Sequence, residues 1–109
     1  MAITLDIQLP HYPRGFHLVT RDIISHLPEL PESGLLVVFI KHTSAGITIN
    51  ENADPDVVHD MLCGFEKVFP AEQFFYQHAE GNSHAHMKTT VVGPSQTLII
   101  HDGEIVFGI

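Results

Sequence analysis

The pattern of apolar and polar positions in the first forty residues predicts three strands and one short helix. Ala2–Leu9 alternates apolar and polar positions, which is the period of a strand with one buried face. A short β-type segment, Phe16–Val19, precedes a helix that Thr20 can cap and that Pro28 ends. Leu35–Ile40 is apolar at every position, as is typical of a central strand covered on both sides.

The middle of the chain carries the clearest helix signal. Ile47–Asn50 alternates like a further strand, and three consecutive polar residues end at Asn52. Asp54 then suits the N-cap position and Pro55 the first helical position, where a missing N–H costs nothing. Apolar residues recur at helical spacing from there to about Val68, so we expect an amphipathic helix.

The last part of the chain predicts a β-meander. Three segments have strand character: Met87–Val92, Gln96–His101 and Glu104–Phe107. Asp102-Gly103 between the last two is a strong hairpin signal, because both residues tolerate a positive φ. Taken together, the pattern predicts an α+β fold.

Composition and charge limit the number of domains, the kinds of binding partner and the compartment that we expect for this chain. A chain of 109 residues is expected to form a single domain, residues 1–109, and its 44% hydrophobic content supports a packed core. The formal net charge of −8 argues against nucleic acid and acidic membrane surfaces as partners. No apolar run is long enough to span a bilayer, and the single Cys63 fits a reducing cytoplasm, so we expect a cytoplasmic protein.

The stretch His78–Lys88 has the densest group of ligating and proton-transferring side chains. If the strand predicted at Met87 extends back to His84, then His84, His86 and Lys88 share one face, with neighbours roughly 6.5 to 7 Å apart. Two imidazoles so placed can bind a metal ion such as Zn²⁺. The candidates for a third ligand are His78, Glu80 and His42.

Two other interpretations of the same stretch remain open. His86 or His78 can act as a general acid–base group without a metal, while Lys88 holds an anionic substrate. Alternatively, neutral histidines can form a hydrogen-bonded cluster at a subunit interface. His42 is also a site candidate, because it follows directly on the predicted buried strand.

Two long motifs resemble a known family. Lys41–Val57 and the segment from Tyr76 through Glu80-Gly81-Asn82 and His86-Met87-Lys88 to Ser95 closely resemble the signatures of the YjbQ-like family, often called secondary thiamine-phosphate synthase. The resemblance covers nearly the whole chain. It implies a compact α+β fold with a β-sheet sandwich and flanking helices, assembled as a homotrimer with sites near the subunit boundaries. Members usually continue with one more strand, which this chain, ending at Gly108-Ile109, is expected to lack.

The resemblance also implies a set of site residues. The expected catalytic residues are His42, Glu51, Asp54, His78, His86 and Lys88. The expected substrate-binding residues are Ser44, Asn50, Asn52, Asn82 and Ser95. A divalent metal, Zn²⁺ or Mg²⁺, is the expected cofactor, with His78, His86 and His42 as ligands and His84 as a supplementary ligand at a position where the family varies.

Three functions follow from these features. The family name implies a transferase that joins a pyrimidine diphosphate to a thiazole phosphate and releases pyrophosphate, and that reaction calls for a divalent metal and cations. The second is a metal-dependent hydrolase or lyase that acts on a small phosphorylated metabolite, with Glu51 or Glu80 as base. The third is a trimeric protein that binds a metal or small ligand without turnover.

Overall fold

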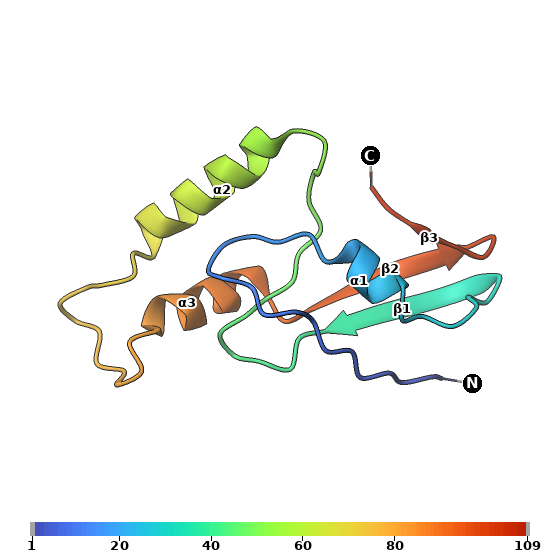
Figure 1. Ribbon diagram of the computed structural model, residues 1–109, viewed down its shortest axis with the longest axis horizontal. Coiled ribbons are helices and arrows are strands. Elements are labelled where there is room, and N and C mark those ends of the chain that lie inside the picture. Colours follow the sequence, from blue (N-terminus) through green and yellow to red (C-terminus); the bar gives the residue numbers. More distant parts are fainter. Residues whose placement is uncertain (1, 109) are drawn as a thin grey trace.

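The computed structural model describes residues 2–108, which form three helices and one three-stranded antiparallel sheet (Figure 1). The elements in chain order are α1 (Thr20–Ile24), β1 (Ser33–Phe39), α2 (Pro55–Val68), α3 (Ser83–Val92), β2 (Ser95–His101) and β3 (Glu104–Val106). The predicted α+β fold is therefore confirmed. The described residues contain a single sheet rather than a sandwich of two.

The sheet has β2 at its centre. β1 and β2 pair from Ser33↔His101 to Phe39↔Ser95, and β3 pairs with the other edge of β2. The hairpin between β2 and β3 turns at Asp102 and Gly103, whose φ angles of 52° and 76° confirm the predicted Asp-Gly turn. The prediction that β1 is a central strand is wrong, because β1 lies at the sheet edge.

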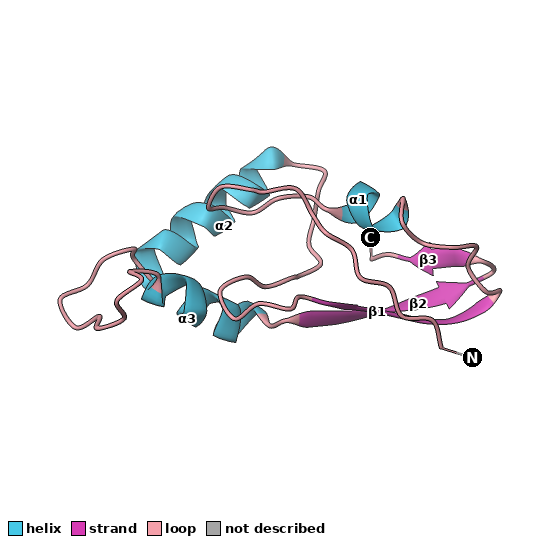
Figure 2. Cartoon of the chain, turned by 60° about the horizontal axis from the view of Figure 1, so that its bottom comes forward, coloured by secondary structure: helices cyan, strands magenta, loops and turns pink. Residues whose placement is uncertain are grey.

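The two faces of the sheet differ in burial. Figure 2 shows α1 over one face, with α2 on the same side and α3 continuing from the end of the sheet. The strand residues on that face are half-buried, and Ile100, at 4% exposure, is the most buried apolar residue described. The opposite face is apolar but exposed. Its side chains include Leu35, Val37 and Phe39 on β1 and Ile99 on β2, with 59–68% exposure.

α2 forms where the sequence predicts it. The Asp54 side chain accepts a hydrogen bond from the Asp56 N–H at 2.9 Å, so it satisfies one of the free donors at the helix start. Pro55 occupies the first turn, and the helix ends at Val68, two residues before Pro70. Both ends depend on local chemistry, and both are confirmed.

α3 replaces a predicted strand, which is the largest correction to the sequence-based fold. Met87–Val92 is helical, as are the residues from Ser83 that precede it. Its β-branched residues favour a strand, but Thr90 finds a local partner by donating its hydroxyl to the His86 carbonyl at 2.8 Å. Gly93, with φ of 95°, ends the helix and lets the chain turn into β2.

Three other predicted strands are absent from the described residues. Ala2–Leu9, Phe16–Val19 and Ile47–Asn50 have extended or irregular backbone without strand pairing. The last of these still has a defined place. The Ile47 N–H donates to the Gly93 carbonyl at 3.1 Å, and a Cβ at Gly46 would lie 2.8 Å from the same oxygen. Gly46 therefore permits the close approach that holds the first motif beside the C-terminal end of α3.

Candidate functional site

α3 divides the histidine stretch between two helix faces. His84 and Lys88 are four residues apart and lie on the same face, whereas His86, two residues from each, points roughly 160° away around the helix. The prediction that all three share one face is wrong, because it assumed the period of a strand. The two faces make different contacts.

The first face carries a network of four side chains, which we call the Lys88 network. The Lys88 Nζ donates to Glu66 Oε1 of α2 at 2.7 Å and to His84 Nδ1 at 3.0 Å. Arg14, from the loop before α1, lies with its Nη1 3.4 Å from the other carboxylate oxygen of Glu66. Three separate segments of the chain thus meet at one carboxylate.

Partial burial strengthens these interactions. His84 is 9% exposed, and the Lys88 side chain is 18% exposed. The hydrogen bond from Lys88 lowers the pKa of the Glu66 carboxyl, although desolvation opposes it, and the charge of Arg14 adds a smaller lowering. Burial, followed by the positive charges of Lys88 and Arg14, lowers the pKa of His84. The network therefore contains an ionised Glu66 and a neutral His84, and its two cations and one carboxylate leave one net positive charge.

The tautomer of His84 follows from its partner. A lysine ammonium donates hydrogen bonds and accepts none, so the Nδ1 atom facing it must be the unprotonated nitrogen. In a neutral imidazole the proton is then on Nε2. The network thus presents hydrogen-bond donors from Arg14, Lys88 and His84.

These donors lie on a groove of about 670 Å³ between the sheet, α1, α2 and α3. Most of its walls are apolar and come from the half-buried sheet face, α1 and the inner face of α2. The polar lining includes Ser44, Asn50, Glu51, Asn52 and all four members of the Lys88 network. An apolar groove with a few convergent polar groups is the usual form of a small-ligand site.

The second face of α3 carries a smaller group, the His78–His86 pair. The two rings meet edge to face with centroids 5.4 Å apart. His86 Nδ1 lies 2.8 Å from the Thr43 carbonyl, so it carries the proton and donates, and Nε2 remains the acceptor. Within residues 2–108, no group of three or more His, Cys, Asp or Glu side chains is close enough to hold one metal ion. The pair alone therefore does not complete a metal site.

The remaining predicted site residues have separate positions. Asp54 caps α2, and Asn50 contacts that helix through its Nδ2, 3.4 Å from the sulfur of Met61. Asn82 stands at the start of α3, where its Oδ1 is buried without a hydrogen-bond partner among the described residues. Ser95 is the first residue of β2 and pairs with Phe39, and His42 lies on the exposed segment after β1. Their predicted roles in binding and catalysis stay predictions.

Two members of the Lys88 network were not predicted. Glu66 lies on the same helical face as Val58 and Leu62, where a carboxylate interrupts an otherwise apolar stripe. That interruption is a signal that a partner cation lies nearby, because buried charges are paired. Arg14 gives no comparable signal, since nothing in the Pro-rich loop around it indicates that it reaches α2.

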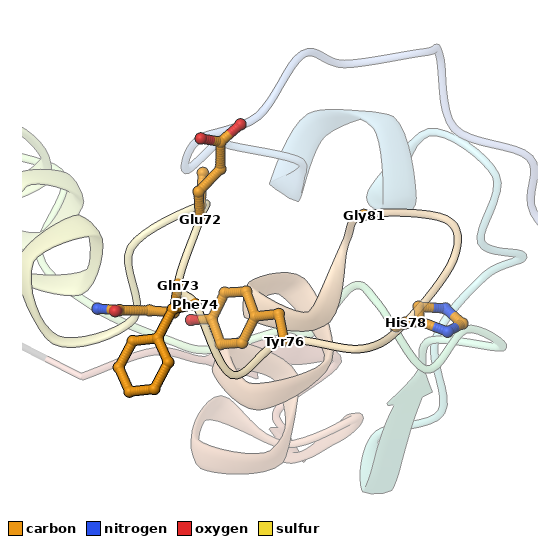
Figure 3. A pocket seen from close by; sticks show the side chains of 7 residues that line it. Glu72, Gln73, Phe74, Tyr76, His78 and Gly81 are labelled. Atoms are coloured by element: carbon orange, nitrogen blue, oxygen red, sulfur yellow. The ribbon is translucent and has the colours of Figure 1, made fainter.

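A second hollow, of about 580 Å³, lies along the loop from Ala71 to Gly81. Figure 3 shows that the side chains of Glu72, Phe74 and His78 point in different directions along its wall. The Tyr76 hydroxyl is engaged, since it donates to the Pro70 carbonyl at 2.9 Å. Because its polar groups do not converge, this hollow is a weaker candidate site than the groove.

The described residues define a class: small α+β proteins with three helices beside one antiparallel sheet. Within it, this chain belongs to the family described as UPF0047 protein YjbQ-like, which matches residues 5–109. The family prediction is thus confirmed.

Relatives from bacteria support this assignment. The UPF0047 protein YugU of Bacillus subtilis is 47% identical over 91 residues, which cover 83% of this chain and 69% of the relative. The UPF0047 protein YjbQ of Salmonella typhimurium is 41% identical over 94% of this chain and 77% of its own length. These names give the family and no reaction.

Solved structures agree with the fold. The conserved hypothetical protein TT1486 from Thermus thermophilus aligns with a TM-score of 0.77 at 35% identity, covering 86% of this chain and 73% of that one. A YjbQ/UPF0047 family protein from Clostridium acetobutylicum aligns with a TM-score of 0.70 at 53% identity. That alignment covers 72% of this chain and 60% of the clostridial protein. No helix within residues 2–108 is long and apolar enough to cross a membrane.

Proposed function

We propose that the groove binds a small phosphorylated metabolite and that the chain acts as a thiamine-phosphate synthase-like transferase. In that reaction a pyrimidine methyl diphosphate is joined to a thiazole phosphate. The bond between the methylene carbon and the diphosphate oxygen breaks, its electron pair leaves with pyrophosphate, and a new bond forms from the methylene carbon to the thiazole ring nitrogen. The observation that carries the proposal is the Lys88 network at the polar end of an apolar groove.

The two parts of the groove suit the two parts of such a substrate. The apolar walls formed by α1, α2 and the sheet can cover a heterocyclic ring. Lys88 and Arg14 carry the positive charge that a phosphate requires. Charge developing on the departing pyrophosphate is stabilised most by donors that are already oriented, and Lys88 is oriented by two acceptors.

Incubation of the purified protein with both precursors and Mg²⁺ tests the activity directly. Thiamine phosphate and pyrophosphate should accumulate in equal amounts, as followed by mass spectrometry. Lys88→Met should abolish the reaction, whereas Lys67→Met, at an exposed position of α2, should leave it unchanged. If the wild-type protein forms no thiamine phosphate at any concentration of the two precursors, the transferase proposal is contradicted.

A second candidate function, metal-dependent hydrolysis or lysis of a phosphorylated metabolite, is favoured by the His78–His86 pair. Catalytic zinc sites use three protein ligands, so the pair needs at least one more. We propose that a second copy of the chain supplies it in the expected homotrimer.

Metal analysis of the purified oligomer, compared between wild type and His86→Ala, tests the metal site. A panel of phosphoesters tests the reaction, and tight metabolite binding without turnover would instead favour the non-catalytic function.

The exposed sheet face supports the proposed assembly. Leu35, Val37 and Phe39 form an apolar row along the outer face of β1, and Ile99 extends it onto β2. Contiguous apolar surface of this kind marks an interaction site. Light scattering should give the mass of a trimer for wild type, and Val37→Lys should lower that mass.

A further inference from the structure

The ammonium group of Lys88 has three N–H donors, and two of them have assigned acceptors. Glu66 Oε1 approaches from α2 at 2.7 Å, and His84 Nδ1 approaches from one turn earlier in α3 at 3.0 Å. Two acceptors on different sides determine the rotation of the ammonium about its Cε–Nζ bond. The direction of the third N–H is then determined as well.

His84 is well placed to hold this geometry. It is 9% exposed, so its ring is confined by the surrounding structure, and both His84 and Lys88 line the groove. Glu66 alone would leave the ammonium free to rotate about a single hydrogen bond, and Glu66 is also shared with Arg14. The lysine side chain itself is flexible, with four carbons between backbone and charge. A second acceptor, His84 Nδ1, therefore fixes the rotation of the ammonium, which the Glu66 contact alone leaves free.

We propose that His84 is a positioning residue for Lys88: its Nδ1 orients the Lys88 ammonium so that the third N–H faces the groove and binds a phosphate oxygen. This inference rests on the proposed function, in which the groove binds a phosphorylated substrate. It assigns His84 no contact with the reacting atoms, and its effect passes entirely through Lys88.

Inorganic pyrophosphate is the probe, and calorimetric titration measures its affinity for the full chain. His84→Leu removes the acceptor, and pyrophosphate affinity should fall about tenfold, the value of one hydrogen bond to a charged group. His84→Asn should restore affinity to within about twofold of wild type, because the asparagine Oδ1 can accept where the imidazole Nδ1 does. His11→Asn, at an exposed position, is the matched control and should bind like wild type.

A double-mutant cycle tests whether His84 acts through Lys88. In a Lys88→Met background, His84→Leu should cause no further loss of pyrophosphate affinity, because the group it orients is gone. An equal loss in both backgrounds would overturn the proposal. So would wild-type affinity in His84→Leu, or an affinity in His84→Asn as low as in His84→Leu.

A second measurement covers the case in which His84→Leu is unstable. The ¹H–¹⁵N signal of the Lys88 ammonium, assigned by its absence in Lys88→Met, should be sharp in wild type and His84→Asn. A broadened Lys88 signal in His84→Asn would contradict the orienting role. If wild type binds pyrophosphate with this pattern yet forms no thiamine phosphate, the transferase proposal fails and the role of His84 stands. If wild type binds no pyrophosphate, the role of His84 fails.

Discussion

The two faces of α3 carry histidines in very different surroundings. On one face, His84 is buried and joins Lys88, Glu66 and Arg14 in a network drawn from three segments of the chain. On the other face, the His86 ring donates to the Thr43 carbonyl and meets the exposed His78 ring edge to face. The comparison shows that one short motif contributes to two separate groups of side chains, a buried network with Lys88 at its centre and a pair of histidines on the opposite face.

The separation follows from helix geometry. Side chains four residues apart in a helix meet, and side chains two residues apart do not. In a strand the same residues would have formed one row. Because the segment is a helix and not the predicted strand, Lys88 points away from His86 and contacts Glu66, 22 residues earlier in the chain.

Replacing Lys88 by methionine should have the largest effect on the first face. The variant removes the ammonium and keeps the length of the side chain, so pyrophosphate affinity should fall about 10- to 100-fold, as expected for charged hydrogen bonds. Lys67→Met should bind like wild type in the same calorimetric titration. Zn²⁺ binding by the other face should be unchanged in Lys88→Met. An equal loss of pyrophosphate and Zn²⁺ affinity would show that the two faces form one site.

Replacing His86 by alanine tests the second face. Zn²⁺ affinity of the purified oligomer should fall more than about tenfold. A loss of about tenfold is typical when a residue that only supports a metal ligand is removed, and His86 is expected to bind the metal itself. His84→Leu is the matched control on the opposite face, and its Zn²⁺ affinity should equal that of wild type. Competition with a zinc indicator dye measures both. A Zn²⁺ affinity that depends on His84 as much as on His86 would contradict the separation of the faces.

Replacing Glu66 by glutamine tests how much the Lys88 network stabilises the fold. Lys88 and Arg14 would lose their common anion, and the free energy of unfolding at pH 7 should fall by about 1 kcal/mol, since the carboxylate is partly exposed and solvent screens the pair. Urea denaturation measures the change. Glu72→Gln, at an exposed loop position, should leave stability unchanged. Equal stability of Glu66→Gln and wild type would mean that the network orients side chains without stabilising the fold.

The parts of the fold that depend on neighbouring residues were predictable. Asp54 and Pro55 start α2, and the Asp102-Gly103 turn forms the last hairpin, because caps and tight turns depend on the chemistry of adjacent residues. α3 was not, since its β-branched C-terminal half has strand propensity that its tertiary setting overrides. The edge position of β1 could not be predicted either, because an apolar run does not show whether its second face is covered within the chain.

The candidate site was predictable in its residue types and not in its pairing. The motifs indicated Lys88 and the polar segment from Asn50 to Asn52, which do share a groove. The pairing of Arg14 with Glu66 spans 52 residues, and no local pattern encodes it. His84, expected to be no more than a supplementary ligand, is the histidine that the structure buries beside Lys88.

The pH dependence of stability gives the smallest expected effect and isolates Glu66 from the other face of α3. Its pKa is lowered in the folded state below the ordinary value of 4.5, chiefly by the hydrogen bond from Lys88. A group with a lowered folded pKa stabilises the fold fully above its unfolded value, and this contribution is lost as the pH falls through the folded value.

The difference in unfolding free energy between wild type and Glu66→Gln should therefore be constant near neutral pH and shrink as the pH falls below about 4.5. Urea denaturation at a series of pH values measures this difference. In a Lys88→Met background, where the main cause of the lowered pKa is absent, the difference should change less with pH. A difference that stays constant down to acid unfolding would show that Lys88 does not hold Glu66 ionised. The contact between Lys88 and Glu66 would then not be a stabilising ion pair. A pH dependence that survives in Lys88→Met would instead assign the effect to Arg14 and His84, whose charges lower the pKa of Glu66 less than Lys88 does.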